Sequence, residues 1–157
     1  MKNGLKLIIS LAIPQIVAAG ASYFTVTRSG SWYRFIEKPE WNPPDWVFGP
    51  VWTALYIMMG IAFYLVWKSN VPISKKRKAI ILWGVQLILN FFWSYIFFGQ
   101  EQIFGAFLEI IVLWLFILLT IFAFARINKW AAWLMVPYIG WVSFAALLNF
   151  TIWELNR

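Results

Sequence analysis

The sequence lacks cysteine and histidine altogether, and it is poor in charge. Without cysteine there is no disulfide and no thiolate nucleophile or metal ligand, and without histidine the commonest general base and imidazole ligand are missing. Charged residues make up 12% of the 157 residues, whereas a soluble domain usually carries about 25%. Such a small number of polar groups cannot cover a surface exposed to water. The composition therefore predicts a protein that lies in a lipid membrane.

Hydrophobic residues make up 62% of the chain and gather in five long runs. A spanning helix needs roughly 20 apolar residues. The runs that meet this length are about Leu5–Val26, Pro44–Trp67, Ala79–Phe98, Ile103–Ala125 and Trp130–Trp153. We therefore expect an all-α fold, an integral membrane bundle of five transmembrane helices, as a single domain over residues 1–157. Only the first connection, residues 27–43, is long.

The first run also has features of a signal peptide. Lys2 and Lys6 precede it, and Ala19-Gly20-Ala21 resembles a cleavage site. The apolar character continues past that site to Val26, which favours a spanning helix.

Lys and Arg are distributed unevenly between the two sides of the predicted bundle. Nine lie on the side of the N-terminus and the second and fourth loops: Lys2, Lys6, Lys68, Lys75, Lys76, Arg77, Lys78, Arg126 and Lys129. Four lie on the other side: Arg28, Arg34, Lys38 and Arg157. The positive-inside rule predicts a cytoplasmic N-terminus. The Lys75–Lys78 run suits anionic lipid headgroups, and we expect no nucleic-acid partner.

Prolines and aromatic residues crowd the end of the first loop and the start of the second run. Pro39, Pro43 and Pro44 favour extended geometry in the residues before them. Pro44 suits the first position of a helix, and Pro50 should kink that helix. Two interpretations are open: an aromatic loop that anchors the fold at the interface, or a lid, residues 27–43, over a pocket. The lid would be the most mobile part of the ligand-free protein and would become ordered on binding.

This stretch resembles a known signature. Its pattern is Trp41-x-Pro-Pro-x-Trp-x-Phe-x-Pro-x-Trp52, followed by Leu55-Tyr56 and Met59-Gly60. Further matches are Asn90-Phe91-Phe92-Trp93-Ser94 and Trp133-x-x-x-Pro137-Tyr138-x-x-Trp141-x-x-Phe144-Ala145. The whole resembles the TspO/MBR family, the tryptophan-rich sensory proteins and translocator proteins. The resemblance implies a bundle, often a homodimer, that binds porphyrins and hydrophobic isoquinoline-type ligands beneath the first loop.

Aromatic stripes with polar members support a pocket at the same place. Residues three or four apart share a helix face, and a polar side chain within the membrane needs a partner. The predicted ligand-binding residues are Tyr33, Trp52, Tyr56, Asn90, Trp93, Phe97, Tyr138, Trp141, Ala145 and Asn149. The alternative is that these side chains simply pack against one another.

Three functions are consistent with such a pocket. The first is a receptor, sensor or transporter of porphyrins, with protoporphyrin IX favoured because no His or Cys is available to bind haem iron, although Tyr ligation stays open. Arg28, Arg34 and Lys38 could meet its propionates. The second is a light-dependent porphyrin-degrading enzyme, in which the resemblance implicates Trp52 and Trp141. The third is a scaffold with a vestigial pocket. We expect no resident cofactor and no metal site.

Two further features bear on ligands. Glu109 lies roughly nine Å into the fourth run at 1.5 Å per residue, where an ionisable group is either functional or paired with a neighbouring helix. Some animal members end in a sterol-recognition pattern of Leu or Val, Tyr, then Lys or Arg. Here Phe150 stands where Tyr belongs and Glu154 where a base belongs, so we expect no sterol binding by that route.

Overall fold

The computed structural model describes residues 2–25 and 31–157, which form five long helices, two short helical segments and no strand. In chain order they are α1 (Asn3–Phe24), η1 (Trp32–Arg34), α2 (Asp45–Lys68), α3 (Ile73–Ser94), η2 (Tyr95–Gly99), α4 (Ile103–Ala125) and α5 (Lys129–Leu155). Each long helix has the length and composition to cross a membrane. The predicted all-α bundle of five transmembrane helices is confirmed, and the chain is a multi-pass integral membrane protein.

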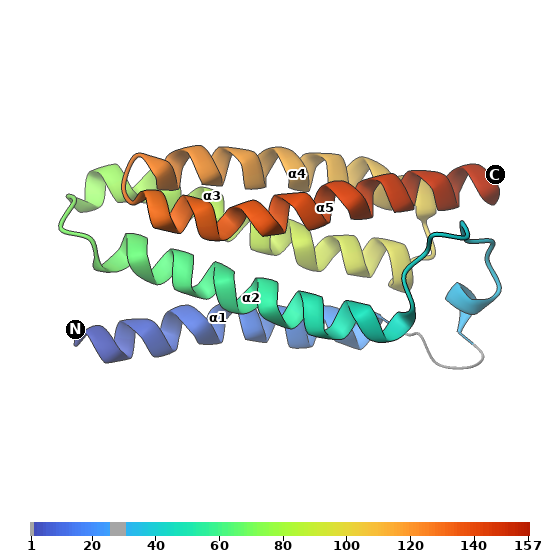
Figure 1. Cartoon of the computed structure of the whole chain (residues 1–157), viewed down its shortest axis with the longest axis horizontal. Helices are drawn as coiled ribbons and strands as arrows, with labels where there is room; N and C mark the ends of the chain where they lie inside the picture. The colour runs from blue at the N-terminus through green and yellow to red at the C-terminus, as the bar shows by residue number, and fades with distance from the viewer. Residues whose placement is uncertain (1, 26–30) are drawn as a thin grey trace.

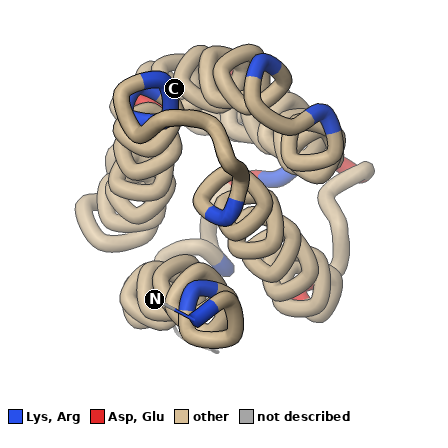
Figure 2. Tube along the Cα trace, turned by 90° about the vertical axis from the view of Figure 1, so that its left-hand side faces the viewer, with Lys and Arg blue, Asp and Glu red and all other residues tan. Residues whose placement is uncertain are grey.

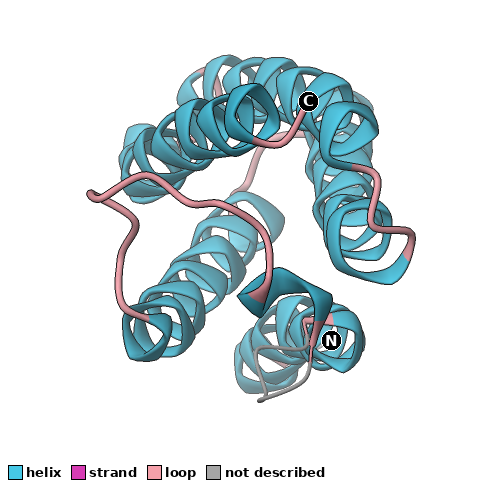
Figure 3. Cartoon of the chain, turned by 90° about the vertical axis from the view of Figure 1, so that its right-hand side faces the viewer, coloured by secondary structure: helices cyan, strands magenta, loops and turns pink. Residues whose placement is uncertain are grey.

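The helices lie side by side along the long axis of the molecule (Figure 1). Going round the bundle, α1 packs on α2, α2 on α5, α5 on α4, α4 on α3, and α3 on α1. The odd number of helices places the two termini at opposite ends. Residues 31–43 of the first loop cross the end of the bundle opposite the N-terminus, as Figure 3 shows from that end.

The observed helix bounds differ from the predicted ones mainly at α1 and α3. α1 ends at Phe24, and Val26 lies outside the described residues. α3 begins at Ile73, six residues before the expected Ala79, since the apolar run marks only the part within lipid and the charged Lys75–Lys78 turn is also helical. At its other end α3 continues into η2, a π-helical turn through Gly99. Such turns are frequent at functional sites.

Glycine allows α1 to pack closely against its neighbours. A Cβ atom at Gly60 of α2 would lie 2.7 Å from the carbonyl oxygen of Ser10, so any side chain there would force the two helices apart. A Cβ atom at Gly20 would lie 3.1 Å from the ring of Phe91 on α3. These contacts hold α1 in the ring of helices.

The interior is filled toward the N-terminal end of the bundle. The rings of Phe63 and Trp83 stack there with centroids 4.2 Å apart, and Met59, Val66 and Met135 are fully buried. The opposite end, beneath the first loop, is where the bundle is hollow.

Candidate ligand-binding site

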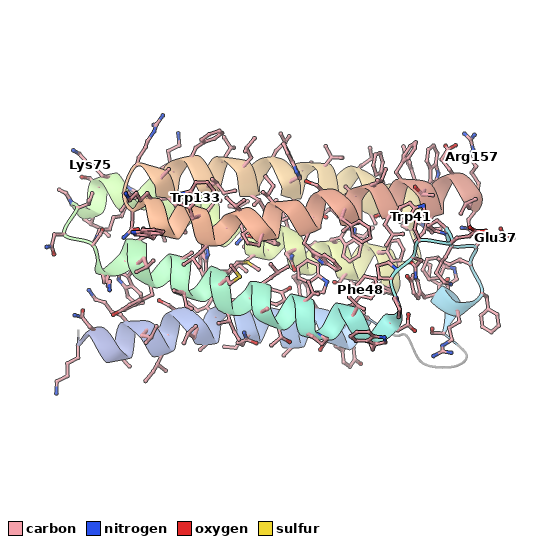
Figure 4. The ribbon with its side chains drawn as sticks, viewed as in Figure 1. Glu37, Trp41, Phe48, Lys75, Trp133 and Arg157 are labelled. Carbon is pink, nitrogen blue, oxygen red and sulfur yellow. The ribbon has the colours of Figure 1, made fainter. Side chains whose placement is uncertain are left out.

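A cavity of about 270 Å³ lies inside the bundle beneath the first loop. Four helices surround it, together with η2 and the loop, while α4 contributes no lining residue. Its lining residues are Ala18, Ala21, Ser22, Thr25, Tyr33, Asp45, Phe48, Gly49, Trp52, Thr53, Tyr56, Asn90, Trp93, Ser94, Phe97, Phe98, Trp141, Ala145, Leu148, Asn149 and Ile152. Figure 4 shows this end of the bundle, with Trp41 and Phe48 labelled.

The structure brings nine of the ten predicted site residues together on the cavity wall. They are Tyr33, Trp52, Tyr56, Asn90, Trp93, Phe97, Trp141, Ala145 and Asn149. Tyr138 does not line the cavity, because its side chain is fully buried between helices one turn before Trp141. Whether these residues bind a ligand remains a prediction.

Eight of the 21 residues that line the cavity are aromatic. Trp93 and Phe97 stack with centroids 5.3 Å apart, four residues along the same helical segment. Phe48 of α2 meets Trp141 of α5 at 6.0 Å, and Trp52 lies 5.6 Å from Tyr56. Most of these contacts are edge-on or tilted, which the ring quadrupole favours. The wall therefore offers broad aromatic faces to a flat ligand.

Asn90 links two tyrosines across the core. Its amide oxygen accepts a hydrogen bond from the Tyr56 hydroxyl, and its amide nitrogen donates to the Tyr138 hydroxyl at 2.9 Å. An asparagine amide has two donors and two lone pairs, so one of each remains for other partners. The polar group expected in mid-membrane is thus satisfied by α2 and α5 and still has hydrogen-bonding capacity at the cavity.

A second amide orients an indole. Trp93 donates from Nε1 to Asn149 Oδ1 at 3.1 Å, and Asn149 donates in turn to the carbonyl oxygen of Ile103 at 2.9 Å. These two hydrogen bonds connect the Trp93 ring to α5 and, through Asn149, to the start of α4. The indole nitrogen of Trp141, in contrast, is buried with no acceptor among residues 2–25 and 31–157.

The described part of the first loop, residues 31–43, covers the cavity and is called the lid below. Tyr33 of η1 is 5% exposed, and its ring meets Phe98 at 5.3 Å and Phe97 at 6.1 Å. Its hydroxyl donates to Asn42 Oδ1 at 3.3 Å. Burial is the main cause that raises the pKa of the Tyr33 phenol above its usual value of 10.0, and the nearby Asp45 carboxylate adds to it.

Polar contacts attach the lid to itself and to α5. The Lys38 ammonium donates to the carbonyl oxygens of Tyr33 and Ile36 at 2.6 and 3.1 Å. Asn156 accepts from the Glu37 amide at 2.9 Å and donates to the Glu37 carbonyl at 2.8 Å. Lys38 is one of the cations expected to meet porphyrin propionates, and in this structure its hydrogen bonds stabilise the lid. Arg34 is exposed, and Arg28 and Thr27 lie outside the described residues.

The contribution of α1 to the wall was not predicted from the sequence. Ala18, Ala21, Ser22 and Thr25 line the cavity, although none of them has an aromatic ring or an amide. Their spacing of three, one and three residues places them on one helix face, but small residues on one face are equally typical of close helix packing. Asp45 and Phe48, both within the recognised signature, also line the cavity.

Glu109 lies away from the cavity, on α4. Both of its carboxyl oxygens are buried, and neither has a hydrogen-bond partner among the described residues. Across residues 2–25 and 31–157, no three acidic side chains come close enough to hold a metal ion. What the cavity itself offers is aromatic surface with a few amide and hydroxyl groups.

Comparison with known proteins agrees with this architecture. The family model described as TspO/MBR family matches residues 10–154. The Tryptophan-rich protein TspO of Chlorobaculum tepidum is 44% identical over 99% of this chain and 98% of its own. The Tryptophan-rich sensory protein of Cereibacter sphaeroides is 35% identical over 94% and 92%. The Translocator protein of Homo sapiens is 38% identical over 80% and 75%. The chain belongs to the TspO/MBR family.

Proposed function

We propose that this protein binds porphyrins, with protoporphyrin IX as the principal candidate, and flat hydrophobic ligands of the isoquinoline type. It would act as a membrane receptor, sensor or transporter. The observation that carries the proposal is a cavity in which eight of the 21 lining residues are aromatic and which also presents the Asn90 and Asn149 amides. Ligand sites are usually apolar with a few polar groups that fix orientation, and a flat macrocycle stacks well on indole faces.

The size of the cavity bears on how such a ligand would sit. Its volume of about 270 Å³ lies just below the roughly 300–1,000 Å³ usual for drug-sized ligands. A tetrapyrrole would therefore extend beyond the void, and the propionates would lie toward the lid, where water can reach them. Lid contacts such as those of Tyr33 would then have to adjust on binding.

A second candidate function is light-dependent porphyrin oxidation, with dioxygen as the oxidant. The observation that favours it is that Trp52 and Trp141 both line the cavity, on α2 and α5, so a bound macrocycle could contact both indoles. Illumination of the complex would give products different from those of free protoporphyrin IX in light. Identical products would reject this candidate and leave the binding proposal intact.

Titration of the purified protein with protoporphyrin IX in detergent, in the dark, tests the proposal through tryptophan fluorescence. The informative variant is Ala145→Phe, because a ring placed on the cavity wall would occupy the space proposed for ligand. Ala54→Phe is the matched control, since Ala54 is exposed on α2 and does not line the cavity. We expect saturable quenching in wild type and control, and at least about tenfold weaker binding in Ala145→Phe, a loss of about 1.4 kcal/mol.

Equal affinity of all three proteins would reject the cavity as the binding site. If protoporphyrin IX and isoquinoline-type ligands all fail to bind the wild-type protein, the scaffold interpretation is favoured instead.

We also propose that the protein resides in a bacterial cell membrane with its N-terminus in the cytoplasm. The nine Lys and Arg residues at the N-terminal end of the bundle support this orientation. Lys75 is exposed, so Lys75→Cys is a suitable labelling site in a chain without other cysteines. A membrane-impermeant maleimide should label this cysteine only after the cells are opened. Labelling in intact cells would show that this end of the bundle lies outside the cytoplasm and would contradict the proposed orientation.

A further inference from the structure

A second hollow lies outside the bundle core, at the opposite end from the candidate ligand-binding site. It is a groove of about 540 Å³ between the start of α3 and the end of α4. Lys75, Lys78 and Arg126 line its outer part, and Leu82, Leu119 and Phe122 line its continuation along the helices. The groove thus changes from cationic to apolar in the direction that leads from the bundle end into the membrane.

Among the described residues, the cations of the groove have no acidic partner. The single ion pair within residues 2–25 and 31–157 joins Glu154 to Arg157, at the other end of the molecule. Five of the six acidic residues, Glu37, Glu40, Asp45, Glu101 and Glu154, belong to segments at that other end, and the sixth is Glu109 within α4. Figure 2 views the N-terminal end and shows Lys and Arg at the near ends of the helices.

Each member of the Lys75–Lys78 run has a different environment. Lys75 and Lys78 are three residues apart, which places both on the groove side of α3. Lys76 is buried, and its ammonium donates to the carbonyl oxygens of Trp67, at 3.0 Å, and Ser69 at the end of α2. Arg77 is exposed and does not line the groove. Only two of the four cations in this run therefore face the groove, so the run does not act as a uniform positive patch.

The apolar part of the groove points to the class of ligand. Leu119 and Phe122 on α4 are 48% and 57% exposed, and they lie one turn apart beside Leu82 of α3. At this depth the surrounding medium is hydrocarbon, so these side chains would contact acyl chains. A free anion would contact only the three cations, and the apolar side chains of Leu82, Leu119 and Phe122 would then have no contact with the ligand.

We propose that the groove binds an anionic phospholipid, with the phosphate held by Lys75, Lys78 and Arg126 and an acyl chain along Leu82, Leu119 and Phe122. Basic pockets between helices at a membrane surface suit such headgroups. This site is separate from the cavity beneath the lid, and the inference does not depend on the function proposed for that cavity.

Competition between two lipids tests the proposal. Delipidated wild-type protein is equilibrated with detergent micelles that contain equal amounts of phosphatidylglycerol and phosphatidylcholine, then recovered, and the retained lipids are quantified by mass spectrometry. We expect phosphatidylglycerol to be preferred, and the preference to fall about fivefold for each cation removed, so that it disappears in Lys75→Ala/Lys78→Ala/Arg126→Ala. Arg77→Ala, on the same helix and with the same loss of charge, should keep the wild-type preference.

The wild-type protein provides a second measurement that needs no variant. Raising the ionic strength from about 0.01 M to about 1 M shortens the screening length from about 30 to about 3 Å, which should abolish the preference. Three results would overturn the proposal: an unchanged preference in the triple variant, an equal loss in Arg77→Ala, or a preference that salt does not affect. Displacement of phosphatidylglycerol by glycerol phosphate would also overturn it, because the groove would then be a site for free anions.

Discussion

Replacing Asn90 with Leu should lower both the free energy of unfolding and the affinity for ligand. The two effects have different causes, so each can be estimated separately. Leucine has the same number and branching of side-chain heavy atoms as asparagine, so the change removes hydrogen bonds without opening a void. The Tyr56 and Tyr138 hydroxyls each lose their contact with the amide. At about 0.6 kcal/mol for each interhelical hydrogen bond in a membrane protein, the free energy of unfolding should fall by about 1.2 kcal/mol.

The effect on ligand binding comes from the hydrogen-bond donor of the Asn90 amide that has no acceptor among the described residues. The free donor of Asn90 is available to a carbonyl group of a ligand in the cavity, and its net contribution would be about 1 kcal/mol. Affinity for a carbonyl-containing isoquinoline-type ligand should therefore fall about fivefold. Unfolding in mixed micelles with increasing dodecyl sulfate measures the first quantity, and dark titration measures the second.

Tyr138→Phe separates the two effects. It removes the hydrogen bond to Asn90 but changes no cavity-lining residue. This variant should lose about 0.6 kcal/mol of unfolding free energy and bind ligand within about twofold of wild type. Equal stability of wild type and Asn90→Leu would refute the structural role of the amide. Equal affinity of wild type and Asn90→Leu would refute its role toward ligand.

Three other expectations follow from the site, and a fourth follows from the family resemblance. Trp52→Phe and Trp141→Phe should keep dark porphyrin affinity within about twofold, because most apolar area remains, and should abolish any light-dependent product. Asn156→Ala should speed hydrogen exchange at the Glu37 amide about tenfold, whereas Thr151→Ala, whose hydroxyl bonds within α5, should not. Because the pKa of Tyr33 is raised in the folded state, its neutral phenol should stabilise the closed lid fully below pH 10.0. This stabilisation should be lost as the pH rises through the higher pKa, so hydrogen exchange in the lid should become faster than its intrinsic pH dependence requires. Tyr33→Phe should remove this additional pH dependence of hydrogen exchange in the lid. The protein should be a homodimer by light scattering in mild, lipid-containing detergent, and a monomer there would reject that expectation.

The fold could be predicted closely because run length alone identifies spanning helices. The start of α3 could not, since the charged residues from Lys75 to Lys78 carry no apolar signal, yet the helix extends through them beyond the membrane. The π-helical turn at η2 was not anticipated either. It depends on how the end of α3 meets α4 and α1, which is tertiary packing rather than a local preference.

The site was predictable on the helices where aromatic and polar residues share a face, and elsewhere it was not. Tyr138 has the same helical spacing as Trp141 but lies in the core, because its hydroxyl bonds to an asparagine 48 residues away. The alanines of α1 give no sign in isolation whether they pack against a helix or border a void. Lys38 was assigned to ligand on the basis of its charge, but backbone carbonyl oxygens of the lid accept from its ammonium.

A crystal structure of the protein grown with protoporphyrin IX in the dark tests the central claim most directly. We predict density for the macrocycle beneath the lid, within about 4 Å of the rings of Trp52, Trp93 and Trp141, the usual range of a packing contact. Density for the macrocycle only on the lipid-facing surface, with the cavity still enclosed by the same side chains, would contradict it.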